Sequence, residues 1–238
     1  IIGTTDTDWE KGLSLPDPAP TKADIDYILD QVNQRVRNKI TREDIVGVYS
    51  GLRPLLSGKS DSTTNLSRNH AVARVAPGLV SVAGGKYTTY RVIGKDAVVL
   101  AAKELGFKVA ESVTERTPIL GADGYHALAN QVPALARRYN LDENRIEHLL
   151  GRYGSLISEV LAPAAEDASL LEAVPGAESY IWAEVRYAVT HEGALHIDDI
   201  VSRRLRVAIE FADRGVAAAQ PIAEFVAPLL GWDQNDIE

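Results

Sequence analysis

The stretch Leu79–Arg91 reads LVSVAGGKYTTYR and decides how the first half of the chain folds. Its first five residues are typical of a buried strand, and the two glycines that follow predict a turn. Lys86 and the threonines after it predict the start of a helix. A helix N-terminus carries about half a positive charge, so free backbone N–H groups and the Lys86 ammonium would face one point. We therefore predict that this corner binds an anion.

The composition excludes several classes of protein. The 238 residues carry a formal net charge of −8, and nonspecific nucleic-acid binding depends on neutralising phosphates, so we expect no nucleic-acid partner. The chain has no cysteine, which excludes disulfides, thiolate catalysis and cysteine-ligated metals and fits a reducing cytoplasm. No apolar run approaches the ~18 residues that a membrane-spanning helix needs.

The organisation of the chain predicts an α+β protein in two parts. Residues 1–110 mix short strands with two long helices, whereas residues 111–238 read as helix after helix and predict an all-α C-terminal domain. The segment Gly106–Gly121 is the expected boundary. The chain contains no methionine and begins IIGTT, as if within a strand, so we expect it to be a piece of a longer protein.

The individual elements follow from periodicity and caps. In the first part we predict long helices at Thr21–Lys39, where Thr21 and Asp24 can form the cap, and at Thr88–Leu105. Strands are predicted at Ile45–Leu52, Ser67–Val75 and Leu79–Ala83. In the second part, helices are predicted at Tyr125–Tyr139 with a kink at Pro133, Glu143–Tyr153, Ala164–Ala173, Ser179–His191, Ile197–Phe211 and Val216–Leu230.

Three basic residues lie at expected strand edges or helix starts: Arg53, Arg68 and Lys86. If they converge, they form a site for phosphate or carboxylate, because guanidinium groups match those oxyanions. Three unrelated surface charges would give the same pattern, and the sequence leaves that alternative open. His70 neighbours Arg68 and could face the same site.

The remaining polar patterns favour structural roles. Asp6 and Asp8 could touch a metal, but a solvated turn is the preferred interpretation because no third ligand is spaced with them. The five histidines form no ligand set, so no metal site is predicted; His126 and His148 are expected to face solvent from helices. The basic segment Ser202–Arg206 has acidic neighbours, which favours ion pairs over nucleic-acid binding.

Several of these segments, taken in order, resemble one known family. The series resembles the C-terminal half of the FAD-dependent, respiratory glycerol-3-phosphate dehydrogenases through GTTDTD at Gly3–Asp8, SGLRPL at Ser50–Leu55, SRNH at Ser67–His70 and GGKYTTYR at Gly84–Arg91. Two helical segments, Ala183–Tyr187 and Asp198–Arg204, look like the C-terminal domain of that family. The resemblance covers essentially the whole chain.

The resemblance implies a reaction, a cofactor and a set of site residues. The reaction is oxidation of sn-glycerol 3-phosphate to dihydroxyacetone phosphate, with hydride passing to the flavin of FAD and electrons passing on to quinone. By similarity, the substrate-binding residues are Arg53, Arg68, His70 and Lys86, of which Arg53 and Lys86 are the catalytic ones. The residues that would line the flavin are Gly84, Gly85, Lys86, Tyr87 and Thr88.

The sequence also departs from that family. It contains no glycine-rich dinucleotide loop of the Rossmann type, so we expect this chain alone to retain no FAD and to be inactive. We expect a cytoplasmic protein, and peripheral contact with the inner face of the cell membrane and a homodimer stay open. Two alternatives also stay open: a non-catalytic helical module for interaction or oligomerisation, and a related flavin amine oxidase.

Overall fold

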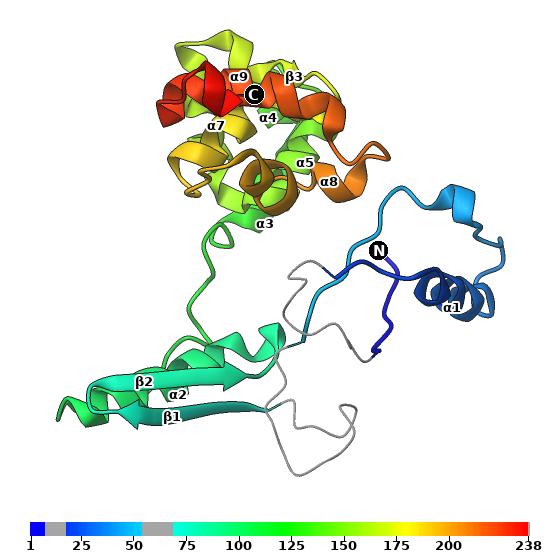
Figure 1. The fold of residues 1–238 in the computed structure, drawn as a ribbon. Helices are drawn as coiled ribbons and strands as arrows, with labels where there is room; N and C mark the ends of the chain where they lie inside the picture. Colours follow the sequence, from blue (N-terminus) through cyan, green and yellow to red (C-terminus); the bar gives the residue numbers. More distant parts are fainter. Residues whose placement is uncertain (8–17, 54–68, 238) are drawn as a thin grey trace. The chain divides into compact units, whose positions relative to one another are not determined.

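The computed structural model describes residues 1–7, 18–53 and 69–237 (Figure 1). The chain divides into two compact units, one made of residues 1–40 and 49–117 and the other of residues 41–48 and 118–238. The main division between the units falls within the predicted boundary Gly106–Gly121. The sequence analysis did not predict that residues 41–48 group with the second unit. The domain bounds at residues 110 and 111 stay a prediction.

The first unit contains two helices and one hairpin. Its helices are α1 (Lys22–Asn33) and α2 (Tyr90–Glu104), its strands are β1 (His70–Ala76) and β2 (Leu79–Gly84), and a 3₁₀ turn η4 (Tyr87–Thr89) precedes α2. Thr21 and Asp24 form a capping box at the start of α1, as the sequence predicted. The antiparallel strands pair Val72 with Val82 and meet at a turn where Gly78 has a φ of 76°.

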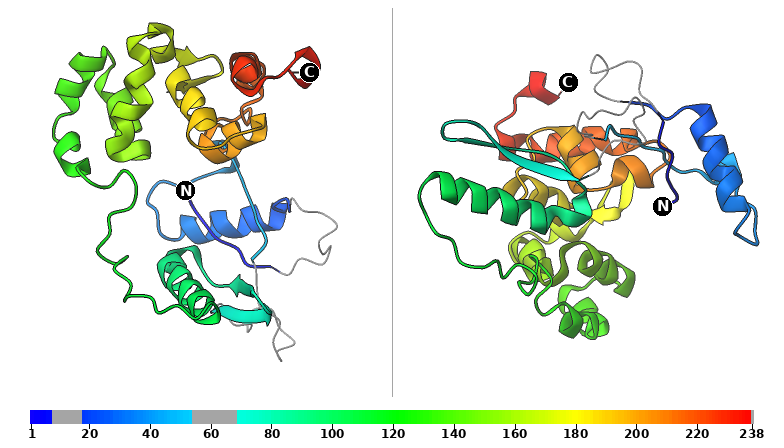
Figure 2. Two further views of the ribbon diagram at one scale, coloured as in Figure 1. Left: turned by 90° about the vertical axis from the view of Figure 1, so that its left-hand side faces the viewer. Right: turned by 90° about the horizontal axis from the view of Figure 1, so that it is seen from below.

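Three predictions for this part of the chain are wrong, of which the helix predicted at Thr21–Lys39 already ends at Asn33. β2 was expected to be buried, but most of its residues are exposed. α2 packs along the two-stranded hairpin (Figure 2). This packing buries little, since Ala102 is the one buried apolar residue among those described in this unit. The segment Ile45–Leu52 forms no strand. An apolar run specifies a strand only where a neighbouring strand can pair with it, and no such neighbour is found among the described residues.

The second unit is mainly helical. Its elements are η2 (Arg42–Asp44), α3 (Tyr125–Ala129), α4 (Val132–Tyr139), α5 (Glu143–Tyr153), η5 (Gly154–Leu156), α6 (Ile157–Leu161), η6 (Ala162–Ala165), η7 (Ala168–Leu171), β3 (Ala173–Val174), β4 (Ala177–Ile181), α7 (Trp182–Thr190), the π-helical turn η8 (Asp199–Arg204), α8 (Val207–Glu210), α9 (Val216–Leu230) and α10 (Gln234–Ile237). The α+β class is confirmed, and α5 and α9 have the predicted bounds.

The expectation of an all-α second part is wrong because β3 and β4 form a small antiparallel sheet. The turn between them needs Gly176, which has a φ of 77°. Four predicted helices also differ, of which Ser179–His191 begins only at Trp182 because its first residues belong to β4. Tyr125–Tyr139 breaks in two rather than kinking, since Pro133 lies in the first turn of α4. Ala164–Ala173 forms short 3₁₀ turns, and Ile197–Phe211 is divided into η8 and α8.

Two hydrophobic clusters form the core of the second unit. One joins α4, α5 and α6 through fully buried residues such as Ile146, Leu149 and Ile157. The other joins β4, α7, η8 and α9 around Tyr180 and Ile222. The buried core of the described residues therefore lies almost entirely in this unit, which makes it the stable body of the chain.

Candidate functional site

The two glycines after β2 make the predicted corner. Gly84 and Gly85 have φ values of 71° and 87°, a backbone conformation that glycine adopts readily and other residues rarely do. A Cβ on Gly85 would lie 2.7 Å from Ile93 Cδ1 and 3.0 Å from His70 Cβ. A side chain at position 85 would be strained by this backbone conformation and would require the side chain of Ile93 to move.

Lys86 follows this turn, but the helix does not open there. Lys86 precedes the 3₁₀ turn η4, in which Thr89 N donates to Lys86 O at 3.0 Å, and α2 begins at Tyr90. The prediction of a helix N-terminus at Lys86 is wrong by one short turn. A single 3₁₀ turn aligns few peptide dipoles, so the Lys86 ammonium itself supplies most of the positive charge at the corner.

The flanking groups at the corner are accessible. Lys86 and Thr88 are exposed, and the ring of Tyr87 is 90% exposed and stacked on the ring of Tyr90 with centroids 5.8 Å apart. An accessible cation beside an aromatic face and a side-chain-free backbone suits a planar anionic group. Reduced flavin is planar and carries negative charge at its ring edge, so the residues of this corner would fit that form of the isoalloxazine.

His70 lies directly beside the glycine turn. Its backbone pairs with Gly84 in the hairpin, and its Nε2 lies 2.7 Å from Asp96 Oδ2 on α2. The carboxylate fixes the orientation of the imidazole ring. The structure therefore places His70 beside Gly84 and Gly85, which Lys86 follows in the sequence, and the role of these residues in one site stays a prediction.

Arg53 lies on a different segment of the same unit. Its Nε is 3.2 Å from Asp6 Oδ1, and both side chains are about 40% exposed. This ion pair joins two of the motifs that carry the family resemblance. Arg68 lies outside the described residues, so the predicted convergence of Arg53, Arg68 and Lys86 stays a prediction.

Asp8, the second carboxylate of the acidic turn, also lies outside the described residues. Within the described part of the chain, no group of three or more histidine, aspartate or glutamate side chains is arranged to hold a metal ion. None of the described helices combines the length and the apolar character that crossing a membrane requires.

The second unit contains a buried polar centre that the sequence analysis missed. The carboxylate of Glu184 is fully buried, accepts a hydrogen bond from Ile181 N at 3.0 Å and lies 3.0 Å from His148 Nε2. Arg152 Nε lies 3.9 Å from the same carboxylate. His148 was expected to face solvent from its helix, but it points inward to this carboxylate. The signal that could have revealed this was the placement of His148 and Arg152 four residues apart on α5.

Arg152 connects this carboxylate to the aromatic core. Its guanidinium lies 5.4 Å from the ring centroid of Tyr180 and 5.9 Å from that of Tyr153, and it donates to Arg204 O. Burial is the main cause that raises the pKa of the Tyr153 hydroxyl above its usual range. The hydroxyl of Tyr180, whose pKa is also raised mainly by burial, donates to Glu210 Oε2 at 2.7 Å.

A second tyrosine–carboxylate pair joins α7 to α6. Tyr187 Oη donates to Glu159 Oε1 at 2.7 Å, and its ring stacks on His191 with centroids 4.5 Å apart. Burial, followed by the hydrogen bond to Glu159, raises the pKa of Tyr187 to about 12. Tyr180 and Tyr187 stay protonated at neutral pH and act as hydrogen-bond donors.

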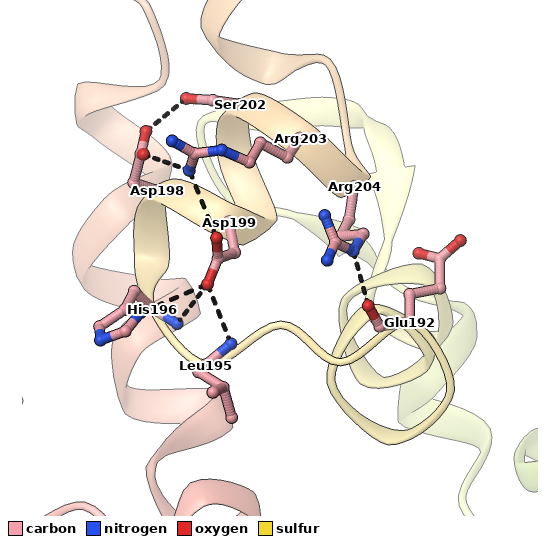
Figure 3. Close-up of polar contacts among 8 residues, drawn as sticks. All are labelled: Glu192, Leu195, His196, Asp198, Asp199, Ser202, Arg203 and Arg204. Atoms are coloured by element: carbon pink, nitrogen blue, oxygen red, sulfur yellow. Dashed lines mark hydrogen bonds and ion pairs between the residues drawn. The ribbon is translucent and has the colours of Figure 1, made fainter. Parts of the chain in front are cut away.

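Figure 3 shows the polar contacts around η8. Asp199 Oδ2 accepts from the backbone N–H groups of Leu195 and His196, both at 3.1 Å, and Arg203 bridges Asp199 and Asp198. These backbone hydrogen bonds lower the pKa of Asp199. The prediction that the basic segment makes structural ion pairs is confirmed for Arg203.

Arg204, the next residue of η8, donates from Nε to Glu192 O at 2.7 Å (Figure 3). Its own carbonyl accepts from Arg152. The two motifs at Ala183–Tyr187 and Asp198–Arg204 are thus joined through Arg152. Their side chains hold α5, α7 and η8 together, which is a structural role.

Comparison with solved structures defines the class of fold. The glycerol-3-phosphate dehydrogenase of Bacillus halodurans, solved as a complex with FAD, matches 98% of this chain and 45% of its own with a TM-score of 0.74 and 22% identity. The fold of the chain is therefore that of a part of this dehydrogenase.

The family follows from the sequence comparisons. A family model described as the C-terminal domain of alpha-glycerophosphate oxidase matches residues 112–237, and the chain belongs to this family. A glycerol-3-phosphate dehydrogenase of Mycobacterium leprae is 56% identical over the whole chain, and a mitochondrial one of Arabidopsis thaliana is 32% identical over 99% of it. The chain spans 40% of the length of the mycobacterial relative and 39% of the plant relative. The resemblance found from the motifs is confirmed.

Proposed function

We propose that this chain is the C-terminal part of an FAD-dependent dehydrogenase that oxidises sn-glycerol 3-phosphate to dihydroxyacetone phosphate. The observation that carries the proposal is the 56% identity to a glycerol-3-phosphate dehydrogenase over all 238 residues. The glycine corner, the accessible Lys86 and the ordered motifs lie within those residues. The segment that binds the FAD pyrophosphate would belong to the part of the relatives that this chain does not span.

The residues of this chain would bind and orient the substrate. Arg53 would hold the phosphate, with Arg68 and His70 beside it, because guanidinium groups make paired hydrogen bonds to phosphate oxygens. Lys86 would lie between the substrate and the flavin and stabilise negative charge at the flavin edge. Gly84, Gly85, Tyr87 and Thr88 would line that edge. Bound FAD would supply the hydride acceptor.

The proposal also includes partners and a location. We propose quinone as the electron acceptor and a cytoplasmic protein that touches the inner face of the membrane peripherally, with a homodimer as its assembly.

The exposed apolar residues of the hairpin, Val75, Leu79 and Val82, support the proposal that further polypeptide covers this unit in the complete enzyme.

The substrate is tested with Arg53→Ala in the complete flavoenzyme that carries this chain. Loss of one charge-assisted contact costs about 1.5–3 kcal/mol, so the KM for glycerol 3-phosphate should rise about 10- to 100-fold. Arg35→Ala, which removes an exposed arginine just after α1, is the matched control and should leave KM unchanged. An unchanged KM in Arg53→Ala would refute the assignment of Arg53.

Two further measurements separate the alternatives. Reduction of the bound flavin by glycerol 3-phosphate but not by glycine would favour the dehydrogenase over an amine oxidase. The purified chain on its own should be colourless, because it lacks the glycine-rich dinucleotide loop. A stoichiometric flavin spectrum from the chain alone would contradict this expectation.

A further inference from the structure

Two pairs of charged or polar side chains join strand β1 to helix α2 within the first unit. His70 Nε2 lies 2.7 Å from Asp96 Oδ2, and Arg74 Nε lies 2.9 Å from Glu104 Oε2. The strand members are four positions apart, which is about 13 Å along a strand, and the helix members are eight positions apart, which is about 12 Å along a helix. Because the two spacings match, the strand and the helix lie side by side and are tied at two points (Figures 1 and 2).

The first of these pairs adjoins the glycine turn, Gly84–Gly85. His70 is the first residue of β1, and its backbone pairs with Gly84 at the end of β2. The His70 Cβ lies 3.0 Å from the position that a Cβ on Gly85 would occupy, and Ile93 Cδ1 lies 2.7 Å from the same position. Ile93 and Asp96 are three residues apart and therefore share one face of α2. The glycine turn is thus packed between β1 and α2, and the pair of His70 and Asp96 links these two elements beside it.

This link holds an end of the hairpin that would otherwise open easily, because the terminal residues of a strand fray. A carboxylate only accepts hydrogen bonds, so His70 Nε2 donates to Asp96, and the ring, which is 19% exposed, is held against α2. Lys86 is fixed from the helix side, since Thr89 N and Thr89 Oγ1 donate to Lys86 O at 3.0 and 2.9 Å. Loss of the Asp96 carboxylate would therefore release the strand side of the turn and let Lys86 shift with it.

We infer that Asp96 is a positioning residue, which acts through His70 to hold the glycine turn and Lys86 in place beside the flavin. This inference rests on the proposed function, in which Lys86 stabilises negative charge at the flavin edge. That charge develops during hydride transfer, so the position of Lys86 should affect the chemical step more than the binding of the substrate.

The test is Asp96→Ala in the complete flavoenzyme that carries this chain. A displacement of about 1 Å costs up to about 100-fold in a well-aligned site, so we expect kcat to fall about 10-fold. The KM for glycerol 3-phosphate should rise by no more than about threefold, because Arg53 and Arg68 would still hold the phosphate.

Glu104→Ala is the matched control, because it removes the α2 carboxylate of the other pair, which lies away from the glycine turn. In each pair one side chain is about half exposed, Asp96 at 46% and Arg74 at 50%, and its partner is mostly covered. Exposed pairs of this kind contribute little to stability, so both variants should lower the melting temperature by a similar small amount. Glu104→Ala should leave kcat and KM within about twofold of the wild type.

The midpoint potential of the bound flavin gives a second measurement that does not depend on the substrate. Because Lys86 would stabilise the reduced, negatively charged flavin, the potential should become more negative in Asp96→Ala and stay unchanged in Glu104→Ala. Asp96→Asn keeps a side-chain oxygen that can accept from His70 Nε2, so it should restore both kcat and the potential to near the wild-type values.

Three results would overturn the positioning role of Asp96. The first is an equal loss of kcat in Glu104→Ala, which would mean a general loosening of the hairpin. The second is a rise in KM in Asp96→Ala without a change in kcat or in the potential. The third is an Asp96→Asn enzyme as slow as Asp96→Ala. A wild-type flavin that glycerol 3-phosphate does not reduce would instead refute the proposed function, and the potentials would still decide the role of Asp96.

Discussion

Replacing Glu184 should destabilise the helical unit more than replacing any exposed carboxylate. Its carboxylate is fully buried and contacts Ile181 N, His148 Nε2 and, at 3.9 Å, Arg152 Nε. Glu184→Ala leaves the half-buried guanidinium of Arg152 without its nearest carboxylate and removes the acceptor for a buried backbone N–H. Breaking such a buried pair costs about 3–5 kcal/mol.

The assay is thermal unfolding of the purified chain followed by far-ultraviolet circular dichroism. For a domain of this size, the loss corresponds to a fall of about 10–20 °C in Tm. Glu184→Gln keeps the shape of the side chain and one acceptor oxygen, so we expect it to lose about 1–3 kcal/mol, the cost of an imperfectly paired buried group. The order of stability should be wild type, Glu184→Gln, then Glu184→Ala.

Glu147→Ala is the matched control. Glu147 is an exposed carboxylate on α5, adjacent in sequence to His148, and its removal should shift Tm by no more than about 2 °C. If Glu184→Ala and Glu147→Ala lowered Tm equally, Glu184 would not stabilise the junction of α5 and α7, and the description of the buried centre would be wrong.

Two further predictions test the same unit. Gly154→Ala should lower the free energy of unfolding of this unit by about 2–4 kcal/mol in urea, because the new Cβ would lie 2.0 Å from Gly121 O and position 154 has a φ of 58°. The control Gly151→Ala on α5 should be neutral or stabilising. Equal effects of the two variants would contradict the close approach of the backbones at Gly154 and Gly121. Burial raises the pKa of Glu192, so the folded state binds its proton more tightly than the unfolded state. The stability that this proton contributes is fully present below pH 4.5, the ordinary pKa of a glutamate, and is lost as the pH rises through the pKa of the folded state. Glu192→Gln should therefore raise Tm at pH 7 and change it little at pH 4.

The strongest sequence signals were local ones. Thr21 and Asp24 predicted the cap of α1, and the apolar periodicity of Glu143–Tyr153 and Val216–Leu230 predicted α5 and α9 to the residue. Caps and amphipathic helices depend on residues within a few positions of each other, which is why a single sequence is enough to find them.

The failures concern interactions between distant residues. Ile45–Leu52 reads as a strand, but the structure pairs it with no other strand among the described residues and instead holds residues 41–48 against the helical unit. His148 reads as a surface residue because its partner Glu184 lies 36 positions away. Neither contact leaves a periodic signal, so neither can be found without the fold.

The candidate site shows the same division between local and distant information. Gly84, Gly85 and Lys86 are contiguous, and the structure bears out the sharp turn that the two glycines predicted. Their association with His70 follows from the antiparallel register of the hairpin, which the turn at Gly78 fixes. Arg53 is different, because its ion pair with Asp6 joins two segments that lie far apart in the sequence. No local pattern predicts such a contact, so the sequence names Arg53 as a candidate but does not place it.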